Sequence, residues 1–385
     1  MNESSPIGAL DNFSSELVDR CRQSGGVLAL AGGRIVLPAV FGFCRGVKRA
    51  LAMLDQEVSR HAQQGGRLFL LGEIIHNPWV NAYFQRRDVT ILRTEDRGRL
   101  EELISPVDCA IIPAFGVPLP VEERLRRIGC RIVDTSCGDV RRLWKWAEGA
   151  ARSGFGVMIF GRADHDETVV TRSRLEACGG QYLVVNKLSQ VDVFCDLLTG
   201  RRPAVEFGEL LTRAANAAAS NAAEFSPFER LAHVSQTTML YDETMQVQTK
   251  LRVAFASRFG AAEAGRRLLL QPTVCRATQA RQSAAVTLCQ ERPDVVVVVG
   301  GFGSSNTRHL YELARSYAAA YFIEDADAIL DAHTLRTFDA ATAQPTLAHD
   351  WLPAKRPVTV GVLSGASSPE SVIGEVLRKI SGFLE

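Results

Sequence analysis

Three cysteines stand where an apolar segment gives way to the pattern of an amphipathic helix. Cys44 follows "RIVLPAVFGF", Cys137 follows "CRIVDTS", and Cys275 follows "RLLLQPTV". The unpaired N–H groups at the start of a helix favour negative charge, so a thiolate is stabilised there. Each thiol could therefore act as a nucleophile or as a ligand, or could simply be a buried cysteine.

The number and spacing of these cysteines separate the options. A nucleophilic enzyme needs one cysteine and a base rather than three similar corners. Structural zinc usually binds closely spaced cysteine pairs, which the sequence lacks. Three thiolates suit an iron–sulfur cluster that keeps one iron open, because four thiolates normally complete such a cluster. The other cysteines, interpreted as structural, are Cys21, Cys109, Cys130, Cys178, Cys195 and Cys289.

Several turns carry hydroxyl and amide side chains at the expected start of a helix. They lie in "VGGFGSSNTRHLYELA", "GVLSGASSPE" and "HVSQTT". Such groups bind anions at helix N-termini, although each can equally serve as a helix cap. Their recurrence favours a phosphorylated ligand. The candidate side chains are Gln236, Thr237, Thr238, Ser304, Ser305, Asn306 and Ser367.

Apolar segments alternate with helical patterns along the chain, which indicates an α/β fold. The longest apolar run, "DVVVVVGGF", is typical of a buried strand and is too short to span a membrane. Three similar corners suggest three α/β units that meet at one point. The expected organisation is an N-terminal extension at 1–33, units at 34–136, 137–274 and 275–385, and an insertion near 198–229 that forms one surface helix and a loop.

Composition limits the class of protein. The chain has 385 residues, of which 46% are hydrophobic and 23% charged, so it can bury a sizeable core. A net charge of +1 argues against nucleic acid as a partner. The first residues, "MNESSPIGAL", lack a basic region followed by an apolar stretch. We therefore expect a cytoplasmic protein without disulfides.

The chain resembles the LytB-type 4-hydroxy-3-methylbut-2-enyl diphosphate reductases, which catalyse the last step of the non-mevalonate isoprenoid route. The resemblance covers roughly residues 36–378 and includes all three corner cysteines. The matching stretches, in order, are "GFCRGVKRA", "GEIIHNPWVN", "DTSCGDV", "HVSQTT", "TVCRATQARQ", "VGGFGSSNTRHLYELA" and "GVLSGASSPE".

The resemblance implies three α/β units in a pseudo-threefold arrangement around a [4Fe–4S] cluster. Cys44, Cys137 and Cys275 would be its ligands, and the fourth iron would bind the allylic hydroxyl of the substrate. Two electrons from ferredoxin or flavodoxin and two protons would remove that hydroxyl as water, giving isopentenyl and dimethylallyl diphosphate. By the same resemblance, Thr237 lies beside the substrate hydroxyl. The diphosphate-binding positions would be His76, Ser304, Ser305, Asn306 and Ser367.

Two positions depart from the family pattern. Phe115 stands where the family has a histidine, and phenylalanine can neither donate a hydrogen bond nor carry charge. The family's His-Pro-Glu motif is aligned here with "GRADHDET", so that Arg162 and Asp164 take the places of its histidine and its proton-delivering glutamate. Arg162 could still bind phosphate, and Asp164 is expected to be the acid. The adjoining His165 could supply an imidazole or could face solvent.

Three functions remain open from the sequence. The first is the ordinary reductase, and the second is a divergent paralogue with another allylic or hydroxylated substrate, which the loss of a histidine at Phe115 favours. The third is a non-catalytic redox sensor that binds the cluster. A sensor needs neither Thr237 nor Asp164, and no basic recognition helix is visible.

Overall fold

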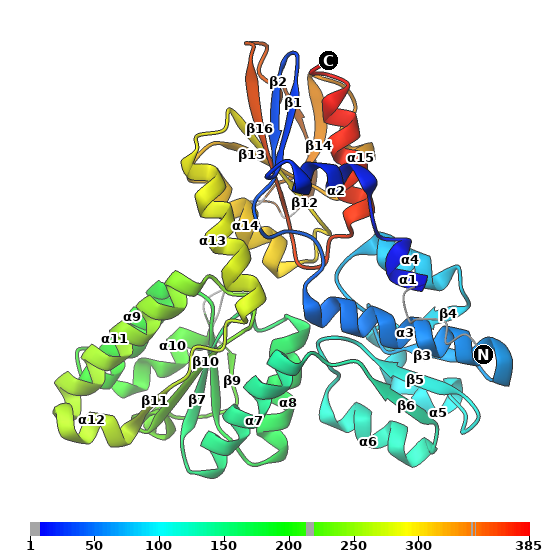
Figure 1. Ribbon diagram of the computed structural model, residues 1–385. Coiled ribbons are helices and arrows are strands. Elements are labelled where there is room, and N and C mark those ends of the chain that lie inside the picture. The colour runs from blue at the N-terminus through cyan, green and yellow to red at the C-terminus, as the bar shows by residue number, and fades with distance from the viewer. Residues whose placement is uncertain (1–7, 213–218, 340–341, 343) are drawn as a thin grey trace. The chain divides into compact units, whose positions relative to one another are not determined.

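The computed structural model describes residues 8–212, 219–339, 342 and 344–385 (Figure 1). The chain divides into two compact units. Unit 1 takes in the stretches up to Thr94, from Val107 to Ala114 and from Arg276 to Glu385, and unit 2 takes in Glu95–Pro106 and Phe115–Cys275. Both units are built from largely parallel sheets with helices packed on them, so the predicted α/β class is confirmed. The boundaries predicted for three units stay a prediction.

The larger sheet of unit 1 has the strand order β1-β2-β16-β12-β13. All neighbouring strands in it are parallel except the pair β1 and β2. Strand β12, which lies between β16 and β13, is completely buried, as expected for a strand covered on both faces. The strands are β1 (Val27–Leu30), β2 (Gly33–Val36), β12 (Val295–Val299), β13 (Ala319–Ile323) and β16 (Val358–Ser364).

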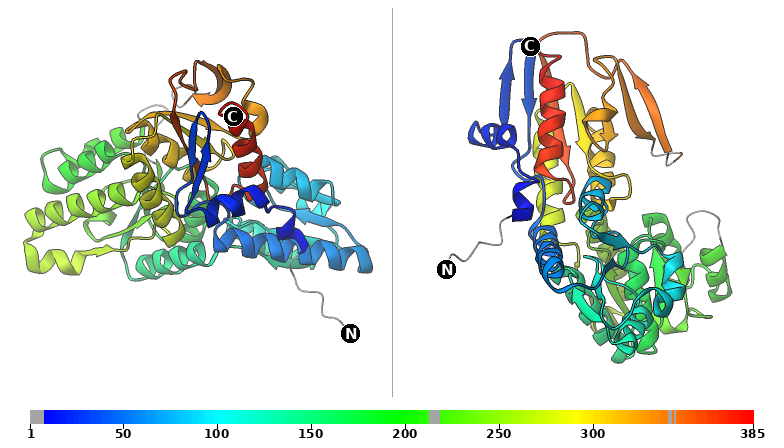
Figure 2. Two further views of the ribbon diagram at one scale, coloured as in Figure 1. Left: turned by 45° about the horizontal axis from the view of Figure 1, so that its top comes forward. Right: turned by 90° about the vertical axis from the view of Figure 1, so that its right-hand side faces the viewer.

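Helices cover both faces of this sheet. The side chains of α2 (Glu16–Gln23) and α15 (Glu370–Ser381) pack on one face, and those of α13 (Arg276–Gln290) and α14 (Ser305–Arg315) pack on the other. The antiparallel hairpin of β14 (Thr334–Asp339) and β15 (Gln344–His349) projects away from the sheet, as the right-hand view of Figure 2 shows. Helix α2 and strand β1 lie within the stretch predicted to be an N-terminal extension, and Val18 and Cys21 of α2 are part of this core.

A smaller sheet of unit 1 follows the helix that begins after Cys44. Strand β3 lies between β4 and β5 and is parallel to both. The long helix α3 precedes β3, and α4 connects β3 to β4. The elements of this part are α1 (Gly8–Asp11), α3 (Arg45–Gln64), β3 (Leu68–Leu70), α4 (Pro78–Gln85), β4 (Val89–Ile91) and β5 (Cys109–Ile112). The 3₁₀ turn η4 (Ala326–Ala328) lies between β13 and β14 and packs with the larger sheet.

Unit 2 is built on a sheet with the order β11-β10-β7-β8-β9, in which only β9 is antiparallel to its neighbour. Helices α7 and α8 pack on one face, and α9 and α11 pack on the other. The sheet and its helices are β7 (Gly156–Phe160), β8 (Tyr182–Val185), β9 (Ala219–Ser220), β10 (Leu231–Ser235), β11 (Leu268–Leu270), α7 (Gly138–Arg152), α8 (Asp166–Ala177), α9 (Leu188–Thr199) and α11 (Tyr241–Phe259). The remaining elements are η1 (Glu95–Arg99), α5 (Leu100–Leu103), α6 (Leu119–Ile128), β6 (Arg131–Asp134) and α12 (Ala261–Arg267).

The stretch 198–229 differs from the predicted surface helix and loop. Its described residues form η2 (Ala204–Glu206), α10 (Phe207–Thr212), β9 and η3 (Ser226–Glu229), while 213–218 lie outside the described residues. Phe207, Phe225 and Phe228 are buried, and their rings contact one another. The prediction of a surface segment was wrong because these three aromatic side chains complete the core of unit 2 beside α9 and α11.

None of the helices in the described part of the chain combines the length and the apolar character needed to cross a membrane.

Candidate active site

The three corner cysteines lie at the starts of helices, as predicted. Cys44 is the N-cap of α3, and its Sγ accepts a hydrogen bond from the backbone N–H of Val47 at 3.4 Å. Cys137 is the N-cap of α7, and Cys275 directly precedes α13. Cys44 belongs to unit 1, whereas Cys137 and Cys275 belong to unit 2. Within the described residues, no three His, Cys, Asp or Glu side chains lie close enough together to hold a metal ion.

Exposure distinguishes the corner cysteines from most of the others. All three are half-buried, whereas five of the six cysteines interpreted as structural are buried. Burial raises the pKa of Cys195 to about 12 and that of Cys289 to about 11, so these two thiols stay protonated at neutral pH. The half-buried thiols at helix starts are the ones whose surroundings favour ligation.

A buried carboxyl and a buried threonine form a close pair in unit 2. Glu167 lies in the first turn of α8, and Thr237 lies just beyond the end of β10. The backbone N–H of Thr237 donates to Oε1 of Glu167 at 2.6 Å, and the Thr237 hydroxyl donates to Oε2 at 2.6 Å. The carbonyl of Thr237 accepts from the backbone N–H of Cys275 at 3.0 Å. The pair is therefore tied to a cysteine corner.

The surroundings of Glu167 suit it to proton transfer. Its side chain is buried, and burial raises the pKa of Glu167 to about 7 in spite of the two hydrogen bonds from Thr237, which lower it. A carboxyl with that pKa can carry a proton at neutral pH and can give it up without a large barrier. Such a group is the kind of acid that a dehydroxylation requires.

Asp164, which the sequence predicted to be the acid, lies at the surface. Its side chain is 72% exposed and binds the guanidinium of Arg162, with Oδ1 3.1 Å from Nε and Oδ2 2.6 Å from Nη2. This ion pair lowers the pKa of Asp164, so its carboxylate is ionised at neutral pH. The structure brings Glu167 and not Asp164 against Thr237.

Arg162 and Gln236 connect the two loops that carry this pair. The backbone N–H of Arg162 donates to Oε1 of Gln236 at 3.1 Å, and Nε2 of Gln236 donates to the Thr238 hydroxyl at 2.7 Å. The guanidinium of Arg162 is engaged with Asp164 at the surface. The side chain of Gln236 therefore holds the loops together, and the predicted phosphate-binding role of Arg162 stays a prediction.

His165 directly follows Asp164 and stands two positions before Glu167. It is the N-cap of α8, and its Nδ1 accepts from the backbone N–H of Glu167 at 3.2 Å. The imidazole is buried, and the ring of Phe115 lies edge-on to it with centroids 6.4 Å apart. His165 therefore faces the interior of the unit rather than solvent.

The predicted anion-binding residues of unit 1 come together on three loops. Ser304 is the N-cap of α14, and its hydroxyl accepts from the backbone N–H of Thr307 at 3.3 Å. The Ser367 hydroxyl lies 3.3 Å from the Ser304 hydroxyl and 3.4 Å from the carbonyl oxygen of His76. A Cβ on Gly365 would lie 1.9 Å from the Thr307 hydroxyl, so only glycine allows the loops to approach this closely.

The start of α14 holds one buried side-chain amide that lacks a hydrogen-bond partner among the described residues. Ser305 and Asn306 are 5% and 4% exposed. Within the described residues, neither the amide nitrogen nor the amide oxygen of Asn306 has a hydrogen-bond partner. A buried amide without a partner is costly, so its retention indicates a ligand that pairs with it. The imidazole of His76, on the neighbouring loop, contacts Glu73 through Nδ1 at 3.1 Å.

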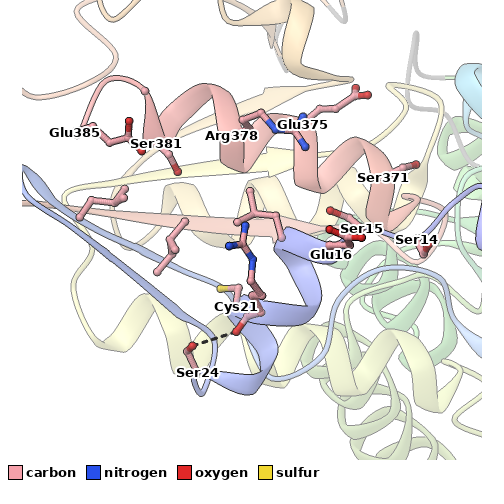
Figure 3. A pocket seen from close by; sticks show the side chains of 15 residues that line it. Ser14, Ser15, Glu16, Cys21, Ser24, Ser371, Glu375, Arg378, Ser381 and Glu385 are labelled. Atoms are coloured by element: carbon pink, nitrogen blue, oxygen red, sulfur yellow. Dashed lines mark hydrogen bonds between the residues drawn. The ribbon is translucent and has the colours of Figure 1, made fainter.

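A cavity lies elsewhere in unit 1. It measures ≈ 980 Å³ and lies between α2, β1 and α15. Figure 3 shows Glu16 and Cys21 from α2 and Glu375 and Arg378 from α15 among its lining side chains. It contains none of the candidate site residues.

Sequence reasoning missed Glu167, and one signal could have found it. The stretch "HDE" at His165 to Glu167 has histidine and glutamate two residues apart, which is the spacing of the family's His-Pro-Glu motif. Aligning the motif there leaves Phe115 as the departure from the family pattern.

The chain is similar to known proteins over most of its length. A family model described as LytB protein matches residues 35–381. The 4-hydroxy-3-methylbut-2-enyl diphosphate reductase of Synechococcus sp. (strain CC9902) is 35% identical, over 97% of this chain and 91% of the relative. The reductase of the same name from Gloeobacter violaceus is 34% identical, over 96% of this chain and 87% of the relative.

Solved structures support the same grouping. A structure of (E)-4-hydroxy-3-methyl-but-2-enyl diphosphate reductase aligns with a TM-score of 0.52 and 26% identity, over 90% of this chain and 99% of that one. The E-1-hydroxy-2-methyl-but-2-enyl-4-diphosphate reductase from Plasmodium falciparum shares the fold, with a TM-score of 0.63 and 18% identity over 91% of this chain and 88% of that one. The chain belongs to the LytB protein family.

Proposed function

We propose that the chain reduces 4-hydroxy-3-methylbut-2-enyl diphosphate to isopentenyl and dimethylallyl diphosphate in a reaction that depends on a [4Fe–4S] cluster. The observation that carries the proposal is the buried Glu167 held by the backbone and the hydroxyl of Thr237. The names of the relatives supply the substrate. In the reaction one C–O bond breaks and one C–H bond forms, while two electrons and two protons enter and water leaves.

The donor set fits the cluster. Cys44, Cys137 and Cys275 are half-buried thiols at helix starts, where negative charge is favoured. They would hold the cluster, which when bound supplies a Lewis-acidic iron for the hydroxyl and a path for the electrons. We propose a ferredoxin or a flavodoxin as the electron donor.

The protein's own residues would divide the remaining work. Glu167 would hold the proton at neutral pH, and the Thr237 hydroxyl would pass it towards the substrate oxygen, because that hydroxyl contacts the carboxyl directly. The loops with Ser304, Ser305, Asn306 and Ser367 would bind the diphosphate through N–H groups and side chains at the start of α14. Binding by this cradle would orient the allylic end.

Anaerobic purification followed by a turnover assay on 4-hydroxy-3-methylbut-2-enyl diphosphate tests the proposal. We expect reduction that depends on the cluster and on a low-potential electron donor. A bound cluster with no turnover on this substrate would refute the proposal and would favour the sensor. The buried Glu167–Thr237 pair speaks against a sensor, since cluster binding alone needs no proton donor.

One observation favours a second candidate, a paralogue with a different allylic or hydroxylated substrate. Phe115 places an apolar ring where the family resemblance leads one to expect a histidine. Turnover of a less charged allylic alcohol in preference to the diphosphate would support this alternative.

A further inference from the structure

The turn that carries Phe115 is fixed in unit 2 by the residue that follows it. Gly116 has a φ of 82°, and a Cβ there would lie 2.4 Å from the Trp144 ring. The backbone therefore rests directly on the indole, and only glycine fits. Trp144 is 5% exposed, and the Arg174 guanidinium lies over its ring at 4.2 Å. The turn cannot shift without unpacking Trp144.

The same segment is tied to α8, the helix that begins beside His165. The backbone N–H of Leu119 donates to the Ser173 hydroxyl of α8 at 2.9 Å. Val170 of α8 also lies against the turn, because a Cβ on Gly116 would be 3.4 Å from its Cγ1. The segment that carries Phe115 therefore packs against the same helix that His165 caps.

The cap bond at α8 fixes which nitrogen of His165 carries the proton. Nδ1 accepts a hydrogen bond from the backbone N–H of Glu167, so the neutral imidazole carries its proton on Nε2. This bond also joins the orientation of His165 to the backbone of the proposed acid. A rotated imidazole would lose the cap and would disturb the start of α8 at Glu167.

The apolar ring of Phe115 favours this orientation of the His165 imidazole. Its ring meets the imidazole at 77°, the edge-on geometry that aromatic pairs prefer. Because phenylalanine has no donor or acceptor, it cannot compete with the Glu167 N–H for Nδ1 and cannot draw the proton away from Nε2. A histidine at this position could do both, and it would itself add a titratable imidazole.

We propose that Phe115 is a positioning residue for His165. It holds the imidazole in the orientation in which Nδ1 caps α8 and Nε2 carries the proton, so that the ring presents one N–H donor to an anionic ligand. The consequence for catalysis rests on the proposed function, whereas the state of the His165 ring does not.

The ring state is tested on the whole protein labelled with ¹⁵N-histidine, with His165→Gln to assign the signals. We expect long-range ¹H–¹⁵N spectra of the wild type to show Nε2 protonated and Nδ1 unprotonated. Phe115→Ala is expected to give a mixture of both tautomers, whereas Phe115→Leu, which keeps an apolar side chain of similar bulk, retains the wild-type tautomer. Phe259→Leu, which alters another half-buried phenylalanine of the same unit, is the matched control and changes nothing.

The catalytic consequence is tested in the same variants. Phe115→Ala should raise KM for the diphosphate up to about tenfold and change kcat less, since an anion contact is made in both ground and transition states. Phe115→His should make KM depend on pH between about 6 and 8, where the added imidazole titrates. A wild-type protein inactive on the diphosphate would remove the proposed function and leave the ring state measurable.

Two results would overturn the positioning role. One is a wild-type His165 protonated on Nδ1. The other is a Phe115→Ala variant whose tautomer and KM match the wild type while only its melting temperature falls, which would make Phe115 a packing residue.

Discussion

The carboxyl of Glu167 accepts hydrogen bonds from both the backbone N–H and the hydroxyl of Thr237, each at 2.6 Å. Glu167 opens α8 and Thr237 follows β10, 70 residues later in the chain. Thr237 also accepts from the backbone N–H of Cys275. A buried carboxyl, a hydroxyl and a cysteine corner are thereby linked by direct contacts within unit 2.

Removing the acid should therefore lower the rate of the chemical step. Glu167→Gln keeps the shape and the contact with Thr237 but cannot deliver a proton. We expect kcat to fall about 10²- to 10⁴-fold with little change in KM, as is usual for the loss of a general acid. Because burial raises the pKa of Glu167 to about 7, wild-type kcat should fall as the pH rises above that value.

The matched control for this prediction is Asp164→Asn, which alters the exposed carboxylate that pairs with Arg162. Its steady-state rate should stay close to wild type. A variant pair with the opposite behaviour, an active Glu167→Gln and an inactive Asp164→Asn, would return the acid to Asp164.

Some features of the fold and of the site could be predicted from the sequence, and others could not. The helix starts at Cys44 and Cys137 and the buried strand β12 could be predicted because each is encoded locally, by an apolar run followed by a change of periodicity. Glu167 could not be separated from Asp164 in this way, because three acidic side chains lie within four positions of "DHDE". Only packing against Thr237 decides which carboxyl is buried.

The misjudged stretch 198–229 has a similar cause. Its richness in alanine suggested a surface segment, yet its structure depends on three phenylalanines spread over some twenty residues. Phe207, Phe225 and Phe228 share no local periodicity, so their meeting in one core is a tertiary event. Periodicity within a window does not report such contacts.

The ligand role of the corner cysteines predicts a selective loss of the cluster. Replacing Cys44, Cys137 or Cys275 by serine should abolish the visible absorption and the Mössbauer signal of the anaerobically purified protein. Cys178→Ser is the matched control, because Cys178 is also half-buried but was interpreted as structural. An intact [4Fe–4S] signal in Cys137→Ser would contradict the assignment.

The unpartnered amide of Asn306 predicts a loss of substrate binding without a loss of stability. Asn306→Leu keeps the volume of the side chain and breaks no hydrogen bond to the described residues of the protein. We expect KM for the diphosphate to rise about 10- to 100-fold, the usual effect of losing a hydrogen bond to a charged group. The melting temperature should equal or exceed that of the wild type, because a buried unpaired amide is removed.

Ser316→Ala, at the exposed end of the same helix α14, is the control for Asn306→Leu and should leave KM unchanged. If Asn306→Leu binds the diphosphate as well as the wild type does, the start of α14 is only a helix cap and the anion site lies elsewhere.

Two buried groups of unit 2 should give the folding stability opposite dependences on pH. His233 of β10 is fully buried, and within the described residues neither ring nitrogen has a hydrogen-bond partner. Burial lowers the pKa of His233 from 6.5 to about 3. The contribution of His233 to the free energy of unfolding is therefore complete above pH 6.5 and is lost as the pH falls towards 3. Glu167 has its pKa raised from 4.5 to about 7, so its contribution is complete below pH 4.5 and is lost as the pH rises through 7.

Between pH 4.5 and 6.5 these two effects oppose each other, because the unfolded chain takes up a proton at His233 while the folded chain holds one at Glu167. The wild type should therefore show a nearly flat free energy of unfolding there. In Glu167→Gln only the His233 effect remains, so the free energy of unfolding should rise by up to about 1.4 kcal/mol per pH unit. In His233→Leu only the Glu167 effect remains, so the free energy of unfolding should fall as the pH rises. Urea unfolding at several pH values measures both, with the exposed His349→Gln as control. Parallel curves for the wild type and His233→Leu would show that His233 does not stay neutral in the folded protein.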